Sequence, residues 1–250
     1  MFYPGDARRL DEAVRGYLAE AESTGPTPVA VIAPHAGYIY SGPIAASAYA
    51  RLAPLKGRVS RVVLIGPAHR LPFRGLAVSG ADAFETPLGT VPVDKEAIAA
   101  ISALPQVKTL DAAFDGEHCL EVHLPFLQTV LGAFKLVPIV VGEASAADVA
   151  EVLETLWTGA DTLPVISSDL SHYHDYATAR RRDKETSKAI EAMAGDRLDW
   201  DDACGRIPIA GLLAVAKKRG FAATTIDLRN SGDTAGPRGE VVGYGAWVVA

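Results

Sequence analysis

Short apolar runs alternate with longer amphipathic stretches along most of this chain. Apolar runs bounded by turn residues predict buried strands, and apolar residues at helical spacing predict helices that cover a sheet. The predicted strands are 29–33, 61–65, 136–141, 163–168, 222–228 and 241–249. The predicted helices are 7–21, 41–52, 94–103, 117–131, 146–157, 176–193, 199–204 and 208–218. Strands that alternate with helices indicate an α/β fold built on a parallel sheet.

Capping residues and prolines refine these boundaries. Asp6 has the side chain of a helix cap, so the first helix is expected to begin directly after it. Ser41-Gly42-Pro43 has the pattern of a cap followed by proline in the first turn, which predicts a helix start there. Pro125 lies within the helix predicted over 117–131, where it is either tolerated near the start or kinks the helix. The segment 75–93 combines short alternating runs with turn residues, which predicts an antiparallel excursion that carries a loop.

Composition and charge narrow the class of protein. A length of 250 residues with 49% hydrophobic and 22% charged residues, without a linker-like segment, predicts one globular domain over 1–250. The net charge of −6 argues against nucleic acid as a partner. Two cysteines without close spacing indicate a reducing compartment, and no apolar run approaches the ~20 residues that cross a bilayer. We therefore expect a cytoplasmic protein that does not insert into membranes.

Three of the predicted strands are followed within a few residues by a histidine. His35 follows strand 29–33, His69 follows strand 61–65, and His172 follows strand 163–168. Ligands of open α/β sheets bind outside the carboxyl ends of the strands. The three imidazoles therefore predict a metal site or an acid–base site at one edge of the sheet. A second interpretation stays open, in which His35 and His69 are hydrogen-bonded residues of two turns.

Their spacing in the sequence makes four further residues candidates for a role in the site. Asp169 lies within one turn of His172, and such a carboxylate can orient the ring and raise its pKa, as a general acid or base requires. The alternative is a capping Asp169 beside an exposed His172. Cys204 precedes a predicted helix start, whose positive end favours thiolate, although a buried structural cysteine is the alternative. His118 and Glu121, three residues apart on a predicted helix, form a pair that could support a metal ligand. His123 points elsewhere, and for it the alternative is a polar helix start capped by its own side chains.

Six motifs taken together resemble the Memo family. They occur in the order of that family and span nearly the whole chain: Pro34-His35-Ala36-Gly37-Tyr38, Gly66-Pro67-x-His69, Glu117-His118-x-Leu120-Glu121-Val122, Ser168-Asp169-Leu170-Ser171-His172-Tyr173, Cys204-Gly205-Arg206-x-Pro208-Ile209 and Val242-Gly243-Tyr244. The fold of the family is similar to that of class III extradiol dioxygenases, which hold non-haem iron with two histidines and a carboxylate. The resemblance therefore implies a three-layer α/β/α domain with a mostly parallel or mixed central sheet.

The resemblance also implies roles for residues of this chain. His35, His69 and Cys204 would be the metal ligands, and Asp169 and His172 would be catalytic, with His172 where the dioxygenases keep an acid–base histidine. A thiolate in place of the carboxylate suits copper, zinc or iron. We expect a transition metal ion as the cofactor, with iron or copper favoured over zinc.

Four more residues are expected around these ligands, either supporting them or lining the pocket: His118, Glu121, Tyr38 and Arg70. Relatives in the family often have serine before the second metal-ligand histidine and another histidine after it. This chain has Ala68 and Arg70 at those positions. Arg70 is therefore expected to add a positive charge at the rim of the pocket.

The implied function is a redox or oxygen-dependent metalloenzyme with a pocket like that of non-haem-iron dioxygenases. Its substrate would be an unknown small molecule or protein. Prokaryotic members are known as protein B of the AmmeMemoRadiSam system, so a radical-SAM enzyme is an expected partner. The alternative is a non-catalytic module that binds a peptide or protein in the same cleft, with Tyr38, Tyr40 and Tyr173 as aromatic walls.

Overall fold

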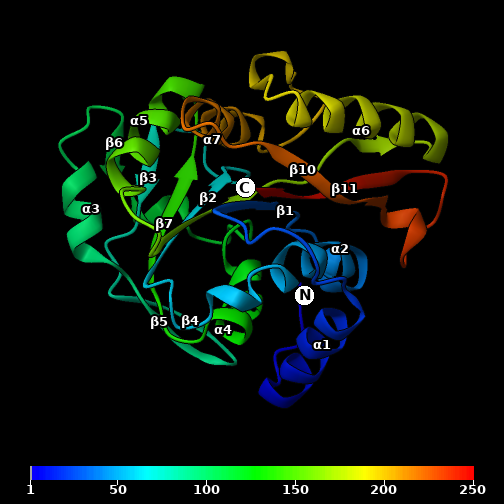
Figure 1. Cartoon of the computed structure of the whole chain (residues 1–250), viewed down its shortest axis with the longest axis horizontal. Coiled ribbons are helices and arrows are strands. Elements are labelled where there is room, and N and C mark those ends of the chain that lie inside the picture. Colours follow the sequence, from blue (N-terminus) through cyan, green and yellow to red (C-terminus); the bar gives the residue numbers. More distant parts are fainter. Residues whose placement is uncertain (1) are drawn as a thin grey trace.

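A mixed β-sheet forms the centre of the computed structural model, which describes residues 2–250 (Figure 1). Four central strands are parallel, whereas β11 runs antiparallel to β1 and β3 runs antiparallel to β7. A short strand, β9 (His172–His174), pairs with β11. The others, in order across the sheet, are β10 (Ala223–Asn230), β11 (Val241–Val249), β1 (Ala30–Ala33), β8 (Thr162–Ser167), β2 (Arg61–Pro67), β7 (Lys135–Val141), β3 (Leu76–Val78) and β6 (Val107–Thr109).

Helices cover both faces of this sheet (Figure 1). One face packs against α1 (Ala7–Glu20), α2 (Tyr38–Ala50) and α4 (Leu124–Leu131), and the other packs against α3 (Lys95–Ile101), α5 (Ala146–Leu156), α6 (Tyr176–Glu191) and α7 (Arg206–Lys218). Successive side chains of a strand point to opposite faces. In β1, Val31 and Ala33 therefore join the first buried cluster, and Ala30 and Ile32 join the second. The predicted α/β fold with a mixed sheet is confirmed, and its layers are α/β/α.

The two predicted helix caps have different outcomes. Asp6 caps α1 as predicted, because its carboxylate accepts a hydrogen bond from the N–H of Arg9 at 2.9 Å. The predicted start of α2 at 41–43 is wrong, since the helix begins at Tyr38 and contains Pro43. This start is fixed from outside the helix: the N–H of Tyr38, which has no partner within the helix, donates to the carbonyl of Phe2 at 2.8 Å. The sequence around residues 41–43 contains no pattern that predicts this contact with Phe2.

Two other predicted helical segments need correction. In the helix predicted over 117–131, residues 117–120 lie in a loop, Glu121–His123 form a single 3-10 turn, and α4 begins only at Leu124. Pro125 lies in the first turn of α4, where its missing N–H costs nothing, so the proline is tolerated near the helix start. Residues 199–204 form turns and not the predicted helical turn. No helix among residues 2–250 combines the length and the apolarity needed to cross a membrane.

The excursion predicted over 75–93 is present. Its centre is an antiparallel hairpin of β4 (Ala83–Thr86) and β5 (Gly89–Pro92), and its first strand, β3, joins the main sheet. The strands β6 and β9 were not predicted. Each has three residues, and an apolar pattern of that length is too short to indicate a strand.

A buried carboxylate joins α6 to the sheet. Asp183 accepts a hydrogen bond from the N–H of Ser171 at 3.1 Å, and Gly243 packs so closely that a β-carbon there would lie 2.1 Å from its Oδ2. Burial raises the pKa of Asp183 to about 6, and the charge of Asp202 adds to this rise, although the Ser171 hydrogen bonds and Arg182 oppose it. A carboxyl group of this kind makes stability depend on pH.

We expect Asp183→Asn to stabilise the protein above pH 6 by about 3 kcal/mol, at about 1.4 kcal/mol for each unit of pKa difference. The folded-state pKa of Asp183 lies above the unfolded value, so the wild type loses stability as pH rises from about 4 to 6. The asparagine side chain of the variant keeps an acceptor for Ser171 and carries no charge. Urea unfolding at pH 4 and pH 7.5 measures this, with exposed Asp115→Asn as the control. An equal effect at both pH values would contradict it.

Candidate metal centre

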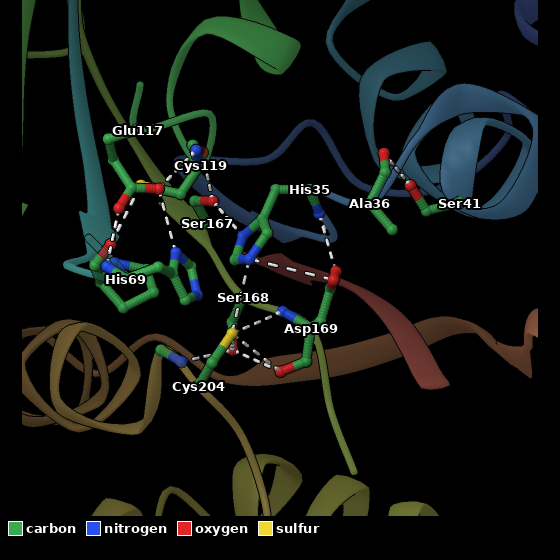
Figure 2. Close-up of polar contacts among 12 residues, drawn as sticks. His35, Ala36, Ser41, His69, Glu117, Cys119, Ser167, Ser168, Asp169 and Cys204 are labelled. Carbon is green, nitrogen blue, oxygen red and sulfur yellow. Dashed lines mark hydrogen bonds and ion pairs between the residues drawn. The ribbon is translucent and has the colours of Figure 1, made fainter. Parts of the chain in front are cut away.

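The carboxyl ends of β1, β2 and β8 lie side by side, because β8 pairs with β1 on one side and with β2 on the other. His35 and His69 each lie two residues beyond their strands, and Asp169 lies two residues beyond β8. Of the three imidazoles predicted to meet at one edge of the sheet, His35 and His69 lie there together (Figure 2). His172 lies further on, in β9, and reaches the same region from another side.

Three side chains converge at this edge: His35, His69 and Cys204 (Figure 2). Each offers one ligand atom, and these three atoms lie within 4.8 Å of one another. Nε2 of His35 is 3.5 Å from Sγ of Cys204, and the two imidazole centroids are 5.1 Å apart. His35 is buried, whereas the His69 side chain is 40% exposed. The three residues therefore form a candidate metal-binding group that is open on the His69 side.

Hydrogen bonds determine which nitrogen of His35 is free. The hydroxyl of Ser167 donates its single proton to the carbonyl of Cys119 at 2.5 Å, so it must accept from Nδ1 of His35, at 2.6 Å. Nδ1 consequently carries the hydrogen, and the lone pair of Nε2 faces Cys204. Burial, together with the charges of His69 and His172, lowers the pKa of His35 to about 3. Its ring is therefore neutral and can bind a metal through Nε2.

Glu117 supports His69 in a similar way. Its carboxylate accepts hydrogen bonds from the backbone N–H of His69 at 2.7 Å and from Nδ1 of the same residue at 3.0 Å. Burial raises the pKa of Glu117, but the hydrogen bonds and charge of His69 outweigh burial and lower it to about 2. The same contact raises the pKa of His69. Nε2 of His69 is the nitrogen left for a metal, and a carboxylate behind it is a common feature of metal sites.

Cys204 is held against the end of β8 just before α7 begins. The N–H of Asp169 donates to Sγ of Cys204 at 3.2 Å, and the N–H of Gly205 donates to Oγ of Ser168 at 2.9 Å. Glycine is needed at 205, because a β-carbon there would lie 2.6 Å from the carbonyl oxygen of Ser167. Burial, and then the charge of Asp169, raise the pKa of the Cys204 thiol to about 12. The expected lowering by the start of α7 is therefore outweighed, and thiolate forms only with a cation to stabilise it.

Asp169 is buried beside this group. Its Oδ1 accepts a hydrogen bond from the N–H of His35 at 2.8 Å, and its Oδ2 is 3.9 Å from Nε2 of that residue. Burial raises the pKa of Asp169, although the His35 hydrogen bond and the charges of His172 and His69 lower it. A buried carboxyl group with a raised pKa, next to a cavity, is a candidate for proton exchange.

Two neighbouring cavities open onto the candidate ligands, and His69, Cys204 and Trp200 line both. The larger has a volume of about 620 Å³ and runs past residues 67–74, 141–144 and the first turn of α7. The smaller, of about 340 Å³, is also lined by His172 and His174. Cavities of these sizes accept small organic molecules. A ligand in either one would lie beside His69 and Cys204.

Comparison with known proteins places this arrangement in a family. The family model described as Memo-like protein matches residues 1–248. The chain belongs to the Memo family. A MEMO1 family protein of Aquifex aeolicus is 35% identical, covering 97% of this chain and 94% of the relative. MEMO1 family proteins of Thermotoga neapolitana and Methanothermobacter thermautotrophicus are 36% and 37% identical, covering 98% and 86% of this chain and 95% and 82% of their own lengths.

A solved structure shares the fold of this Memo-family chain. The crystal structure of an uncharacterized protein from Escherichia coli K12 superposes with a TM-score of 0.53 and 12% sequence identity. It covers 89% of this chain and 100% of its own. At this identity the likeness concerns the fold alone.

The Memo-family motif that begins at Glu117 contributes a different carboxylate from the one expected. His118 and Glu121 do pair, with Nδ1 of His118 2.7 Å from Oε1 of Glu121. However, the Phe2 ring stacks on His118 with centroids 4.2 Å apart, and the Tyr3 hydroxyl donates to Glu121. Within residues 2–250 this pair makes no hydrogen bond to the three candidate ligands. It anchors the N-terminal segment, and Glu117 takes the supporting position.

The pocket residues differ in part from those expected of a Memo-family chain. Tyr38 is 4% exposed, and its hydroxyl donates to the carbonyl of Val122 at 2.6 Å, so it belongs to the core and not to the pocket. Arg70 does line the larger cavity, as predicted. The aromatic side chains at the cavities are Phe73 and Trp200, and Tyr173 lines neither of the two.

Sequence reasoning missed four residues of this site: Ser167, Glu117, Trp200 and His174. Glu117 is the first residue of the motif that also contains His118 and Glu121. The predicted helical spacing favoured Glu121 as the supporting carboxylate, but residues 117–120 form a loop and not a helix. His174 could have been found from its alternation with His172, because residues two apart on a strand share a face. Trp200 lies in a polar stretch, where an exposed tryptophan is itself a signal of binding.

Proposed function

We propose that this Memo-family protein is a transition-metal-dependent oxidoreductase that holds one metal ion with His35, His69 and Cys204. The observation that carries this proposal is the pair of hydrogen bonds from the two Nδ1 atoms, to Ser167 and Glu117. They leave an Nε2 atom of each histidine free beside a thiol. Two imidazole nitrogens and one thiolate are a donor set that transition metals prefer.

Iron or copper fits this proposal better than zinc. All three metals accept imidazole and thiolate, but zinc has no redox chemistry. When bound, the metal supplies a centre at which a substrate and dioxygen can exchange electrons. The exposed side of His69 and the adjoining cavities leave room for a substrate there. This dioxygenase-like character also rests on the resemblance in fold.

We assign proton transfer to His172 and a positioning role, with a share in proton exchange, to Asp169. His172 lines the smaller cavity together with His69 and Cys204, so its ring can meet a substrate that lies there. Asp169 accepts from the N–H of His35 and donates its own N–H to Sγ of Cys204, which ties two of the candidate ligands together.

We expect His172→Ala to keep its metal and to lose turnover by about 10²-fold or more, the usual contribution of a general acid or base. Asp169→Asn should show a smaller loss. The measurement is oxygen uptake by the metal-loaded protein with catechol, together with metal content. His118→Ala, which changes a histidine outside the site, is the control. Loss of metal from His172→Ala would make this residue a ligand instead.

A non-catalytic binding module is the competing function, and the 74% exposure of Trp200 beside the cleft favours it. If the metal-loaded wild type consumes no oxygen with catechol, the oxidoreductase proposal fails and the binding function is favoured.

We further propose, from the family resemblance, that the protein acts in the cytoplasm with a radical-SAM system. A gene for a radical-SAM enzyme next to its own would support that partnership.

A further inference from the structure

We infer that the larger cavity binds a small organic anion with an apolar body, of the size and polarity of an aromatic carboxylate, and presents it to the candidate metal centre. The second half of this inference rests on the proposed function, because it takes the chemistry to occur beside His69 and Cys204. The first half depends only on the residues that line the cavity.

Positive charge gathers at this cavity in a chain whose net charge is −6. Three arginines line it, Arg70, Arg74 and Arg206, and one carboxylate, Glu143, does so. Arg74 pairs with Glu143 at 3.2 Å, which offsets one of the three charges. Arg70 and Arg206 form no ion pair with any acidic residue in the described part of the chain. An anion in the cavity would therefore meet two arginines that are free to bind it.

The position of Arg206 at the cavity is fixed by its neighbours. Its guanidinium lies 4.7 Å from the ring centroid of Trp200, a cation–π contact that keeps the charge at the cavity. Arg206 is also the first residue of α7, so the positive end of the helix dipole adds to the charge. A planar guanidinium with a fixed position matches the two oxygens of a carboxylate.

The rest of the cavity suits an apolar body. Its walls include four apolar side chains: Leu71, Phe73, Val141 and Ile207. A volume of about 620 Å³ is far larger than a bare inorganic anion needs and falls in the range of small-molecule sites. His69 and Cys204 line the same cavity, so a molecule whose anionic end is held by the arginines would have its other end near the metal centre.

The test compares 2-naphthoate with its uncharged amide, 2-naphthamide, by calorimetry on the metal-free protein at low salt. We expect naphthoate to bind at least about tenfold more tightly than naphthamide, and we expect Arg70→Gln and Arg206→Gln each to remove about tenfold of that advantage. Binding should also change tryptophan emission, because Trp200 is exposed at the cavity while Trp157 and Trp247 are buried.

The double variant Arg74→Gln/Glu143→Gln is the matched control, since it removes an arginine together with its paired carboxylate and leaves the net charge of the cavity unchanged, and it should change naphthoate binding less than threefold. Equal affinity for the two probes, undetectable binding of naphthoate, or arginine variants that bind like the wild type would overturn the inference. His35→Ala separates this outcome from that of the metal proposal. It should keep arginine-dependent binding of naphthoate even though it loses metal, so the two proposals fail independently.

Discussion

His35→Ala and His69→Ala variants are expected to be purified with less than about a tenth of the metal bound by the wild type, for which we expect about one ion per chain. Each change removes one of three ligands, and two remaining donors rarely retain a transition metal during purification. The prediction is strongest for His35, because its Nε2 lies 3.5 Å from Sγ of Cys204 and is kept free by Ser167. Elemental analysis of protein purified without chelators measures the content.

Two companion variants make this experiment specific. Glu117→Gln keeps the ligands but removes the negative charge behind His69, so its metal affinity should fall about 10- to 100-fold without being abolished. His118→Ala also removes an imidazole, but one that contacts Glu121 and Phe2, and it should keep its metal. Circular dichroism establishes that each variant is folded. Wild-type metal content in folded His35→Ala and His69→Ala would refute the site.

Cys204→Glu is expected to change which metal the protein prefers. It replaces thiolate with carboxylate and leaves the two histidines, so affinity should move from copper or zinc towards ferrous iron by at least about tenfold. Anaerobic titrations of the wild type and the variant with each metal measure this shift. Cys204→Ser, which removes the thiolate without supplying a carboxylate, is the control and should weaken binding of all three metals.

The pH dependence of metal affinity is a second test of Cys204 as a ligand. Burial and Asp169 raise the pKa of the Cys204 thiol to about 12, so a metal that binds thiolate must displace a proton. The apparent affinity of the wild type should therefore fall about tenfold for each unit by which pH drops, and Cys204→Glu should lose this slope near neutral pH. A metal preference unchanged by Cys204→Glu, with no sulfur neighbour in X-ray absorption, would show that Cys204 is not a ligand.

The α/β class and the positions of two candidate ligands, His35 and His69, follow from local sequence pattern. Runs such as 29–33 are apolar on both alternating faces, which is possible only when helices cover both sides of a sheet. Parallel strands end at a common edge, so a histidine just past each of two strands predicts a shared site. The third residue, Cys204, entered through the family resemblance, and its place against β8 depends on the close approach that Gly205 permits.

Contacts between distant segments were decided only by the tertiary structure. Helical spacing favoured Glu121 as the supporting carboxylate, but residues 117–120 form a loop, and Glu117 turns to His69, 48 residues away in the chain. Tyr38 was expected at the pocket, but it is buried because the N-terminal segment and α4 pack over it.

The sequence by itself therefore determined the α/β class and the strand ends that carry the histidines, because these depend on periodicity within single segments. The tertiary structure decided which nitrogen of each histidine is free, the pKa of Cys204 and the gathering of arginines at the larger cavity. Those properties depend on the distance and burial of groups that lie far apart in the chain. Local patterns carry no information about such distances, since the energy of a hydrogen bond or a charge depends on its surroundings in space.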